Sequence, residues 1–154
     1  FVAWLPQAEL RQLIADADIC LGAFGDTPQS LMTVQNKIYE GLAMQRAVIT
    51  GDSPAVRAAL HNGEEIFLCE RQNPVALAQA IQILALDRNL RVRLAVQGAQ
   101  AFAQRFTLAH IGARFRDALG RGVGVRDLDV AGPRRRHALR ARLGRDRQDP
   151  ADAA

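Results

Sequence analysis

Residues 34–44 have the sequence VQNKIYEGLAM, and a largely apolar run, AVIT, follows at residues 47–50. Asn36 is a good N-cap, because its side-chain oxygen can accept a hydrogen bond from one of the free backbone N–H groups that open a helix. Ile38 and Leu42 then fall at helical spacing, and the short run at 47–50 is typical of a strand buried in a parallel sheet. The segment therefore predicts a loop, a helix that begins at Asn36, a buried strand and a second loop.

Lys37 and Glu40 lie three residues apart, so both project from one face of the first turns of this helix. A helix N-terminus offers free N–H groups and the positive end of the helix dipole, which suit a phosphate, and Lys37 adds a full positive charge. The two oxygens of the Glu40 carboxylate can accept hydrogen bonds from both hydroxyls of a ribose. The pattern indicates a nucleoside diphosphate or its sugar ester. An ordinary surface ion pair explains the same spacing.

A helix and a strand are predicted before this segment. The helix is opened by Pro6, and residues 19–24 form a continuous apolar run that fits a parallel strand. Residues 25–30 have the composition of a loop, and they follow a strand at the place where open α/β sheets bind their ligands. Gly25 is therefore a candidate for close approach of the backbone to a phosphate, and a plain turn explains this glycine equally well.

A short helix is predicted directly after the buried strand. Ser53 or Asp52 can cap it, Pro54 falls in its first turn, and it runs to about Leu60. His61 then lies at the C-terminal end of this helix, where a cation interacts favourably with the helix dipole. We interpret His61 as such a residue rather than as a catalytic base.

The rest of the folded part is predicted to contain one more strand and then only helices. Residues 66–69 form the strand, and helical periodicity begins at Pro74. Thr107 caps a last helix, whose apolar side consists of Ile111, Phe115 and Leu119. Strands that alternate with helices, followed by helices alone, predict an α/β fold with a parallel sheet.

Charge is unevenly divided along the chain. Residues 1–120 hold 11 Lys and Arg against 11 Asp and Glu, whereas residues 121–154 hold 9 against 5, so the net charge of +4 belongs to the C-terminal tail. Apolar periodicity stops near Leu119, and the composition beyond it cannot bury enough surface to order itself. We expect a folded domain at residues 1–119 and a basic, disordered tail at residues 120–154. Its cluster of three arginines at 134–136 could contact anionic lipid or nucleic acid, but a solvated run of charge is the commoner meaning.

The sequence lacks the roughly 18 consecutive apolar residues of a membrane span and the charged and apolar regions of a secretion signal. Cys20 and Cys69 lie in apolar runs, which is typical of buried thiols in a reducing compartment rather than of a disulfide. The cysteines and histidines show no metal-ligand spacing. We therefore expect a cytoplasmic protein without a metal site, with a peripheral position at the inner face of the membrane as an alternative.

Several segments carry a resemblance to a known family. A strand and a Pro-containing loop at residues 1–6 lead to a helix, and the apolar run at 19–21 follows. The NKIYEGLA and AVIT segments lie within 36–50, and a closing segment at 62–68 precedes Asn73-Pro74, which opens a helix. Together they resemble the C-terminal half of a retaining glycosyltransferase of the GT-B fold, of the group 1 or family 4 type, over roughly residues 1–119. The resemblance implies a Rossmann-like parallel sheet with helices on both faces.

The chain departs from the family pattern at four positions. The family has two carboxylates in a Glu-x7-Glu pattern, and this chain keeps only the second, Glu40, because Met32 stands eight residues earlier. Gln35 replaces the usual Pro before the Asn-Lys pair, and Gln45 and Ala47 replace the Gly and Pro of the turn into the strand. The nucleotide end of the site is thus retained, while the sugar end is altered.

The resemblance assigns roles to individual residues. It implies that Lys37 is the catalytic residue, which stabilises negative charge on the departing diphosphate, and that Glu40 holds the ribose. It further implies that the backbone near Gln35 and Asn36 meets phosphate or sugar, and that the Trp4-Leu5 loop lies near the base. No metal or other cofactor is expected, because cationic groups and a helix N-terminus supply the electrostatic stabilisation.

The implied reaction passes a sugar from a nucleoside diphosphate to a sugar, lipid or other acceptor, with retained configuration. The chain begins at Phe1 within an expected strand, so we expect an N-terminal domain with the acceptor site upstream of this sequence, and no transfer by the chain alone. One alternative is a nucleotide-sugar epimerase, but this half offers few acid or base groups for it. Another is a non-catalytic α/β module whose basic tail binds nucleic acid, but the neutral folded part and the tail's lack of aromatic residues count against it.

Overall fold

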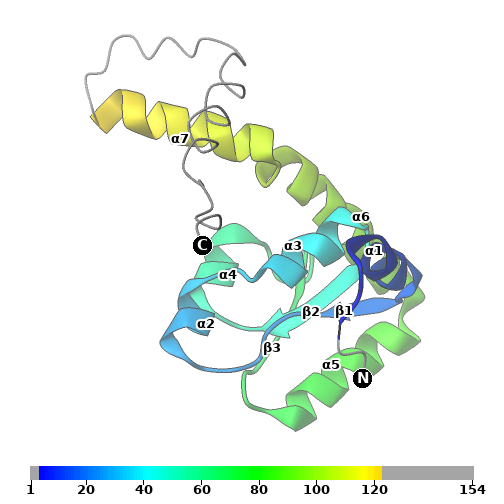
Figure 1. Cartoon of the computed structure of the whole chain (residues 1–154). Helices are drawn as coiled ribbons and strands as arrows, with labels where there is room; N and C mark the ends of the chain where they lie inside the picture. Colours follow the sequence, from blue (N-terminus) through cyan, green and yellow to red (C-terminus); the bar gives the residue numbers. More distant parts are fainter. Residues whose placement is uncertain (1–3, 123–154) are drawn as a thin grey trace, which may run out of the picture. The chain divides into compact units, whose positions relative to one another are not determined.

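Three parallel strands form the centre of the structure (Figure 1). The computed structural model describes residues 4–122, and the side chains of residues 4–120. The strands are β1 (Ile19–Leu21), β2 (Ala47–Gly51) and β3 (Phe67–Cys69), in the order β1-β2-β3. The central strand β2 is buried along its whole length. The run predicted as a buried strand therefore is one.

Helices surround this sheet within residues 4–122. They are α1 (Gln7–Asp16), α2 (Pro28–Met32), α3 (Asn36–Ala43), α4 (Pro54–Ala59), α5 (Pro74–Leu86), α6 (Arg88–Arg105) and α7 (Leu108–Gly122). In Figure 1, α3 and α4 lie above the sheet and α5 lies below it. Five of these helices are capped by a side chain that accepts a backbone N–H bond, and the caps are Thr27, Ser53, Asn73, Asp87 and Thr107.

The two faces of the sheet carry separate apolar cores, because successive side chains of a strand point to opposite faces. On one face, Val48 of β2 packs with Ile38 and Leu42 of α3. On the other face, Ile49 packs with Leu84 of α5. The long helix α6 contributes to both cores. The predicted α/β fold, a parallel sheet with helices on both faces, is confirmed.

The start of α3 differs from the prediction by one residue. Gln35, with extended backbone angles, is the N-cap, and Asn36 is already the first helical residue. The carbonyl of Gln35 accepts the first helical hydrogen bond, from the N–H of Ile38 at 3.0 Å. The prediction that Asn36 caps the helix was therefore wrong, and no side chain caps α3.

Strand β1 is shorter than predicted and an unpredicted helix follows it. The strand ends at Leu21, although the next two residues still bond to β2. The N–H of Gly22 donates to the carbonyl of Ile49 at 2.7 Å, and the hydroxyl of Thr50 accepts from the N–H of Ala23 at 3.1 Å and donates to its carbonyl at 3.2 Å. In the segment predicted as a loop, Thr27 accepts from the N–H of Ser30 at 3.3 Å and caps α2.

Two predictions about helix ends have different outcomes. The helix α4 ends with Leu60 as its C-cap, as predicted, and His61 is the next residue, just past the helix rather than in its last turn. Thr107 does cap the last helix, since its hydroxyl accepts from the N–H of His110 at 3.4 Å. The predicted apolar side of α7 is exposed, with Phe115 63% accessible.

Both cysteines are free thiols, as predicted. Among the described helices, none combines the length and the apolar character needed to cross a membrane. Contacts divide the chain into two units, Phe1–Arg116 and Asp117–Ala154, and α7 continues to Gly122, past the predicted domain boundary at residue 119. Most of the predicted tail at 120–154, and the strand expected at residues 1–3, lie outside the described residues.

Candidate functional site

The helix α3 begins on the side of the sheet where the strands have their carboxyl ends. The chain leaves the carboxyl end of β1, passes through α2 and α3, and enters the start of the parallel strand β2. The N-terminus of α3 therefore lies at the carboxyl ends of the strands, where open α/β sheets bind ligands. Asn36, Lys37 and Glu40 are exposed on this helix. Its buried residues are Ile38, Gly41 and Leu42.

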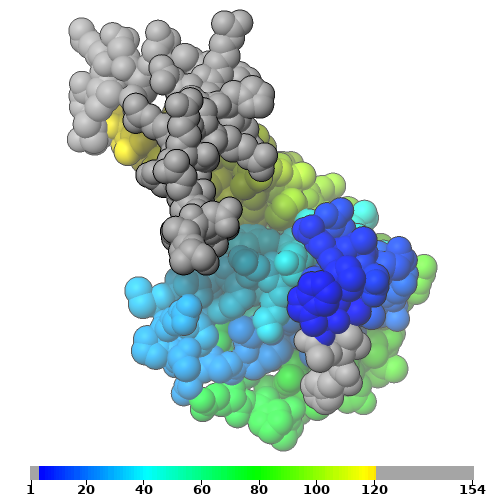
Figure 2. Space-filling view, in the orientation of Figure 1, coloured from blue at the N-terminus to red at the C-terminus, as the bar shows by residue number. Residues whose placement is uncertain are grey.

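Lys37 and Glu40 form no ion pair with each other, and none of the ion pairs among residues 4–120 contains either of them. The alternative of an ordinary surface ion pair is thus not realised. Both side chains instead line a hollow of about 260 Å³ between α1, β1 and α3. Figure 2 shows α1, in dark blue, beside the cyan surface of α3.

The walls of this hollow are apolar. They are formed by Leu10, Leu13, Ile14, Ala17, Cys20, Leu21 and Gly41. A cation and a carboxylate at the rim of an apolar hollow suit a ligand that combines a ring with charged and hydroxyl groups. Because both charges are solvated and unpaired with each other, they are free to bind such a ligand.

The loop after β1 is ordered by its own polar groups. The hydroxyl of Ser30 donates to the carbonyl of Gly25 at 2.6 Å and to that of Thr27 at 2.9 Å. A Cβ atom at position 25 would meet no other atom within 4 Å, so the protein itself does not require a glycine there. Close approach of a ligand to Gly25 stays a prediction.

The remaining predicted residues lie in different surroundings. Trp4 is 79% exposed and Leu5 is half-buried, just before α1. The amide of Gln35 donates to the carbonyl of Ser30 at 3.2 Å, while its Oε1 atom is buried without a hydrogen-bond partner. Met32, which stands in place of the first family carboxylate, is 79% exposed at the end of α2. The structure thus brings Gln35, Asn36, Lys37 and Glu40 together.

A chain of contacts fixes α3 on the side away from its charged residues. Tyr39 packs on the ring of Phe106, with centroids 5.0 Å apart, and the guanidinium of Arg105 lies 5.3 Å from the same ring. Arg105 also pairs with the carboxylate of Glu65 at 2.6 Å, and the backbone N–H of His61 donates to this carboxylate at 3.0 Å. His61 is thus a structural residue here, and the contacts join α3 to α6.

The pKa of Glu65 makes the stability of this arrangement dependent on pH. Burial raises the pKa of the carboxyl, but the hydrogen bonds from Arg105 and His61 outweigh this effect and hold it below the usual value of 4.5. A carboxyl with a lowered pKa stabilises the fold above the unfolded-state pKa, and the contribution disappears as pH falls through the folded-state pKa. We expect the free energy of unfolding to decrease as the pH is lowered below 4.5. In Glu65→Gln it should change less with pH.

Urea unfolding of both proteins at a series of pH values between neutral and acid measures the effect. Glu64→Gln is the matched control, because its carboxylate neighbours Glu65 in sequence and is exposed. In the Glu64 variant, the free energy of unfolding should change with pH as steeply as it does in the original chain. Parallel curves for the original chain and the Glu65 variant would contradict the assignment.

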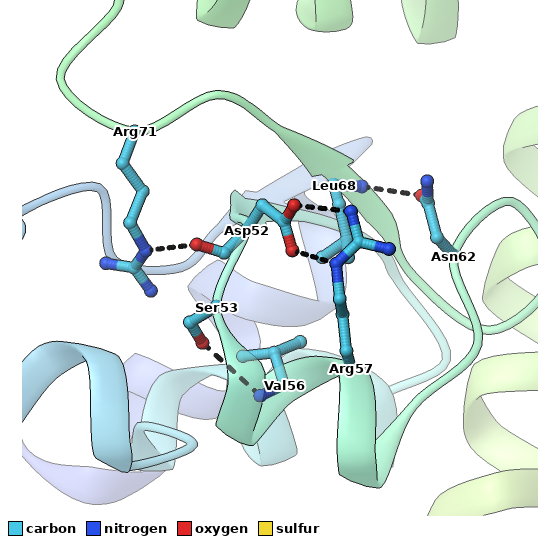
Figure 3. Close-up of polar contacts among 7 residues, drawn as sticks. All are labelled: Asp52, Ser53, Val56, Arg57, Asn62, Leu68 and Arg71. Atoms are coloured by element: carbon cyan, nitrogen blue, oxygen red, sulfur yellow. Dashed lines mark hydrogen bonds and ion pairs between the residues drawn. The ribbon is translucent and has the colours of Figure 1, made fainter.

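Sequence reasoning missed a polar cluster at the carboxyl ends of β2 and β3 (Figure 3). Asp52 forms a two-pronged pair with Arg57, at 2.6 Å and 2.5 Å, while its carbonyl accepts from the Nε of Arg71 at 2.6 Å. Arg71 also donates to the carbonyls of Gly25 and Ser30. No periodic or spacing signal connects Arg71 to a loop 46 residues earlier.

The family sequence pattern described as Glycosyl transferases group 1 matches residues 1–87, more than half of the 154 residues. The chain belongs to this family. The matched residues include α1, α3 and all three strands of the sheet. They also include every predicted site residue. No curated protein matches the chain in sequence.

Several solved structures share the fold of this group 1 domain. Anabaena HepE in complex with UDP-glucose is 19% identical and has a TM-score of 0.62, over 71% of this chain and 29% of that chain. Sucrose-phosphate synthase from Thermosynechococcus elongatus is 20% identical with a TM-score of 0.63, over 79% of this chain and 30% of that chain. The C-terminal domain of LpcC from Francisella tularensis is 19% identical with a TM-score of 0.57, over 70% of this chain and 52% of that chain.

These similarities establish the fold as that of a GT-B C-terminal domain. The chain spans less than a third of the length of HepE and of the synthase. The described residues contain no group of three or more His, Cys, Asp and Glu side chains arranged to hold a metal ion.

Proposed function

We propose that the chain supplies the donor-binding half of a retaining glycosyltransferase. The observation that carries this proposal is the exposed N-terminus of α3 in a group 1 domain, with Lys37 and Glu40 at the rim of an apolar hollow. Its place at the carboxyl ends of parallel strands is where a nucleotide binds in this type of fold. HepE, which shares the fold, was crystallised with UDP-glucose.

The proposed chemistry is electrostatic. When the bond between the sugar and the diphosphate breaks, negative charge grows on the departing phosphate oxygens. The N–H groups that open α3 have no capping side chain, so they remain available to these oxygens. Lys37 adds a charged donor at the same place, and such preorganised donors stabilise the transition state more than the ground state. Lys37 is therefore the proposed catalytic residue, and no metal is needed for this role.

The other contacts complete the proposed donor site. Glu40, one turn along the helix, accepts from the two ribose hydroxyls. The backbone of Gln35 and Asn36 and the loop at Gly25 lie on the phosphate side, and the Trp4-Leu5 loop lies near the base. The walls of the hollow exclude water from one side of these charges, which strengthens their interactions with a ligand.

The proposed reaction needs more than this chain. A GT-B active site lies between two domains, so an N-terminal domain would carry the acceptor site, and the isolated chain would bind the donor without transferring its sugar. A cytoplasmic location is proposed, because the free thiols Cys20 and Cys69 suit a reducing compartment. The nucleic-acid alternative depends on the basic tail, which lies outside the described residues.

Titration of the ¹⁵N-labelled chain with UDP, GDP and ADP tests the proposal. At least one of these diphosphates should shift the amide signals of Asn36, Lys37 and Glu40 in a saturable way. The corresponding nucleoside, which lacks phosphate, should bind at least about tenfold more weakly, a loss of roughly 1.4 kcal/mol. If none of the three diphosphates gives a saturable shift at millimolar concentrations, the proposed donor site is wrong.

A further inference from the structure

We propose that Arg71 is a positioning residue of the donor site, which holds the loop after β1 and the start of α3 in the geometry that binds a diphosphate. This inference rests on the proposed function and extends it to a residue that no sequence pattern indicates. Arg71 follows β3, whereas the predicted phosphate-binding residues follow β1. The three nitrogen atoms of its guanidinium connect these two regions.

The guanidinium of Arg71 donates to three backbone carbonyls from two different segments. Its Nε atom donates to the carbonyl of Asp52 at 2.6 Å, one terminal nitrogen donates to the carbonyl of Gly25, and the other donates to that of Ser30 at 3.2 Å. A planar group with five N–H donors can satisfy several convergent carbonyls at once, which an ammonium group cannot do with the same geometry. Arg71 therefore fixes the loop at Gly25 and Ser30 to the end of β2.

The contact continues from the loop to α3. The carbonyl of Ser30 accepts from Arg71 and also from the side-chain amide of Gln35, in both cases at 3.2 Å. Gln35 is the N-cap residue of α3, two positions before Lys37. A shift of Ser30 would thus move Gln35 and the N–H groups that open the helix.

The surroundings of Arg71 are built to hold its side chain in place. A Cβ atom at Gly51 would lie 2.6 Å from the Cγ atom of Arg71 and 2.8 Å from the carbonyl oxygen of Ala23, so glycine lets the arginine stem pass over the end of β2. The N–H of Gln72 also donates to the carbonyl of Phe24 at 3.1 Å, which joins the same two loops through the backbone. The stem of Arg71 is thus fixed against Gly51, and its guanidinium is fixed by the three carbonyls. The loop after β1 is held in turn by the guanidinium and by the backbone bond from Gln72.

Arg71 contacts the loop rather than a ligand, so its loss should weaken donor binding through disorder of the loop. We expect Arg71→Met to weaken binding of the diphosphate that the chain prefers by roughly three- to tenfold, because ordering the loop then takes place at the binding step. Arg71→Lys keeps the stem and the charge, but it should bind nearly as weakly, because a single ammonium cannot reach three carbonyls. The lysine variant keeps the test valid if the methionine variant does not fold.

Three measurements separate positioning from a general effect on stability. Titration with UDP, GDP and ADP gives the affinity, thermal unfolding gives the stability, and amide hydrogen exchange of Gly25, Ser30 and Thr33 reports on the loop. Exchange at these amides should increase in both Arg71 variants, and millimolar guanidinium chloride should restore part of the affinity, whereas potassium chloride of equal ionic strength should not. Arg57→Met is the matched control, because Arg57 pairs with Asp52 through its side chain and does not contact the loop.

The outcomes are distinguishable from failure of the proposed function. If the original chain binds a diphosphate and Lys37→Ala weakens this binding, but both Arg71 variants bind like the original chain, the positioning role is overturned and the donor site stands. Equal losses of diphosphate affinity in the Arg71 and Arg57 variants would also overturn the positioning role. The loss would then come from a general effect on the fold and not from the contact with the loop. If the original chain binds none of the three diphosphates, both proposals fail.

Discussion

Replacing Lys37 by alanine is expected to weaken binding of the preferred nucleoside diphosphate by about ten- to more than a hundredfold. The reason is the loss of a charged hydrogen bond to phosphate, which is worth roughly 1.5–3 kcal/mol. The side chain is exposed and has no ion-pair partner among the described residues, so its removal leaves no buried charge unpaired. The loss therefore measures the contact with the ligand itself.

Removal of Lys37 should also weaken binding of the transition state more than binding of the ground state. Negative charge grows on the departing diphosphate, so in an active enzyme that contains this chain Lys37→Ala should lower turnover as well as donor affinity. Glu40→Gln should act differently, because an amide offers one good acceptor where the carboxylate offers two, and its effect should fall mainly on binding of ribose-containing donors.

Calorimetric titration of both variants with UDP, GDP and ADP measures these effects. Lys37→Arg is a useful control, since it keeps the charge and should retain most of the affinity. Thermal unfolding should change little in each case, because surface substitutions of this type alter stability by less than about 0.5 kcal/mol. Unchanged affinity in both Lys37→Ala and Glu40→Gln would remove the donor site from the N-terminus of α3.

The parts of the fold that could be predicted are those whose signals lie within one short segment. Ser53-Pro54 and Asn73-Pro74 place a capping residue directly before a proline, and a helix begins at each. The same combination occurs at Thr27-Pro28, where α2 begins, but five residues are too few to show apolar periodicity. The extent of β1 was also not predictable, because residues 22 and 23 bond to β2 partly through the side-chain hydroxyl of Thr50, which comes from another strand.

The candidate site likewise has a part that could be predicted from one short segment and a part that could not. Lys37 and Glu40 belong to one helix, so their spacing alone places them on one side of it, and the structure agrees. Arg71 acts on Gly25 across 46 residues, and only the folded sheet brings the ends of β1, β2 and β3 together. The cap of α3 was misplaced because the residue type at Asn36 favours a cap, whereas the extended backbone falls on Gln35. Gln35 is instead tied to the preceding loop by the bond from its side-chain amide to the carbonyl of Ser30, a contact that the residue type of Asn36 does not indicate.

Leu42→Ala is expected to lower the free energy of unfolding by about 2–5 kcal/mol, the range for removing a fully buried leucine side chain. Leu42 is 0% exposed on the inner side of α3, and it packs in the same core as Val48 of β2. The neighbouring helix approaches so closely that a Cβ atom on Gly98 would lie 2.6 Å from the Cδ2 atom of Leu42. Because α6 also packs on the opposite core through Leu94, it cannot move inward freely to fill the space, which favours the upper part of the range.

Leu86→Ala is the matched control, since this leucine is 79% exposed at the end of α5 and its loss should change stability by less than about 0.5 kcal/mol. Urea unfolding of the two variants and the original chain gives the comparison. Lys37 and Glu40 lie on the other side of α3 from Leu42, so the folded fraction of Leu42→Ala should still bind the preferred diphosphate within about twofold of the original affinity, a change of roughly 0.4 kcal/mol. A loss of stability as small as that of Leu86→Ala would mean that α3 is not packed on the sheet through Leu42, and the charged groups at its N-terminus would then lack the rigid support that a preorganised phosphate site requires.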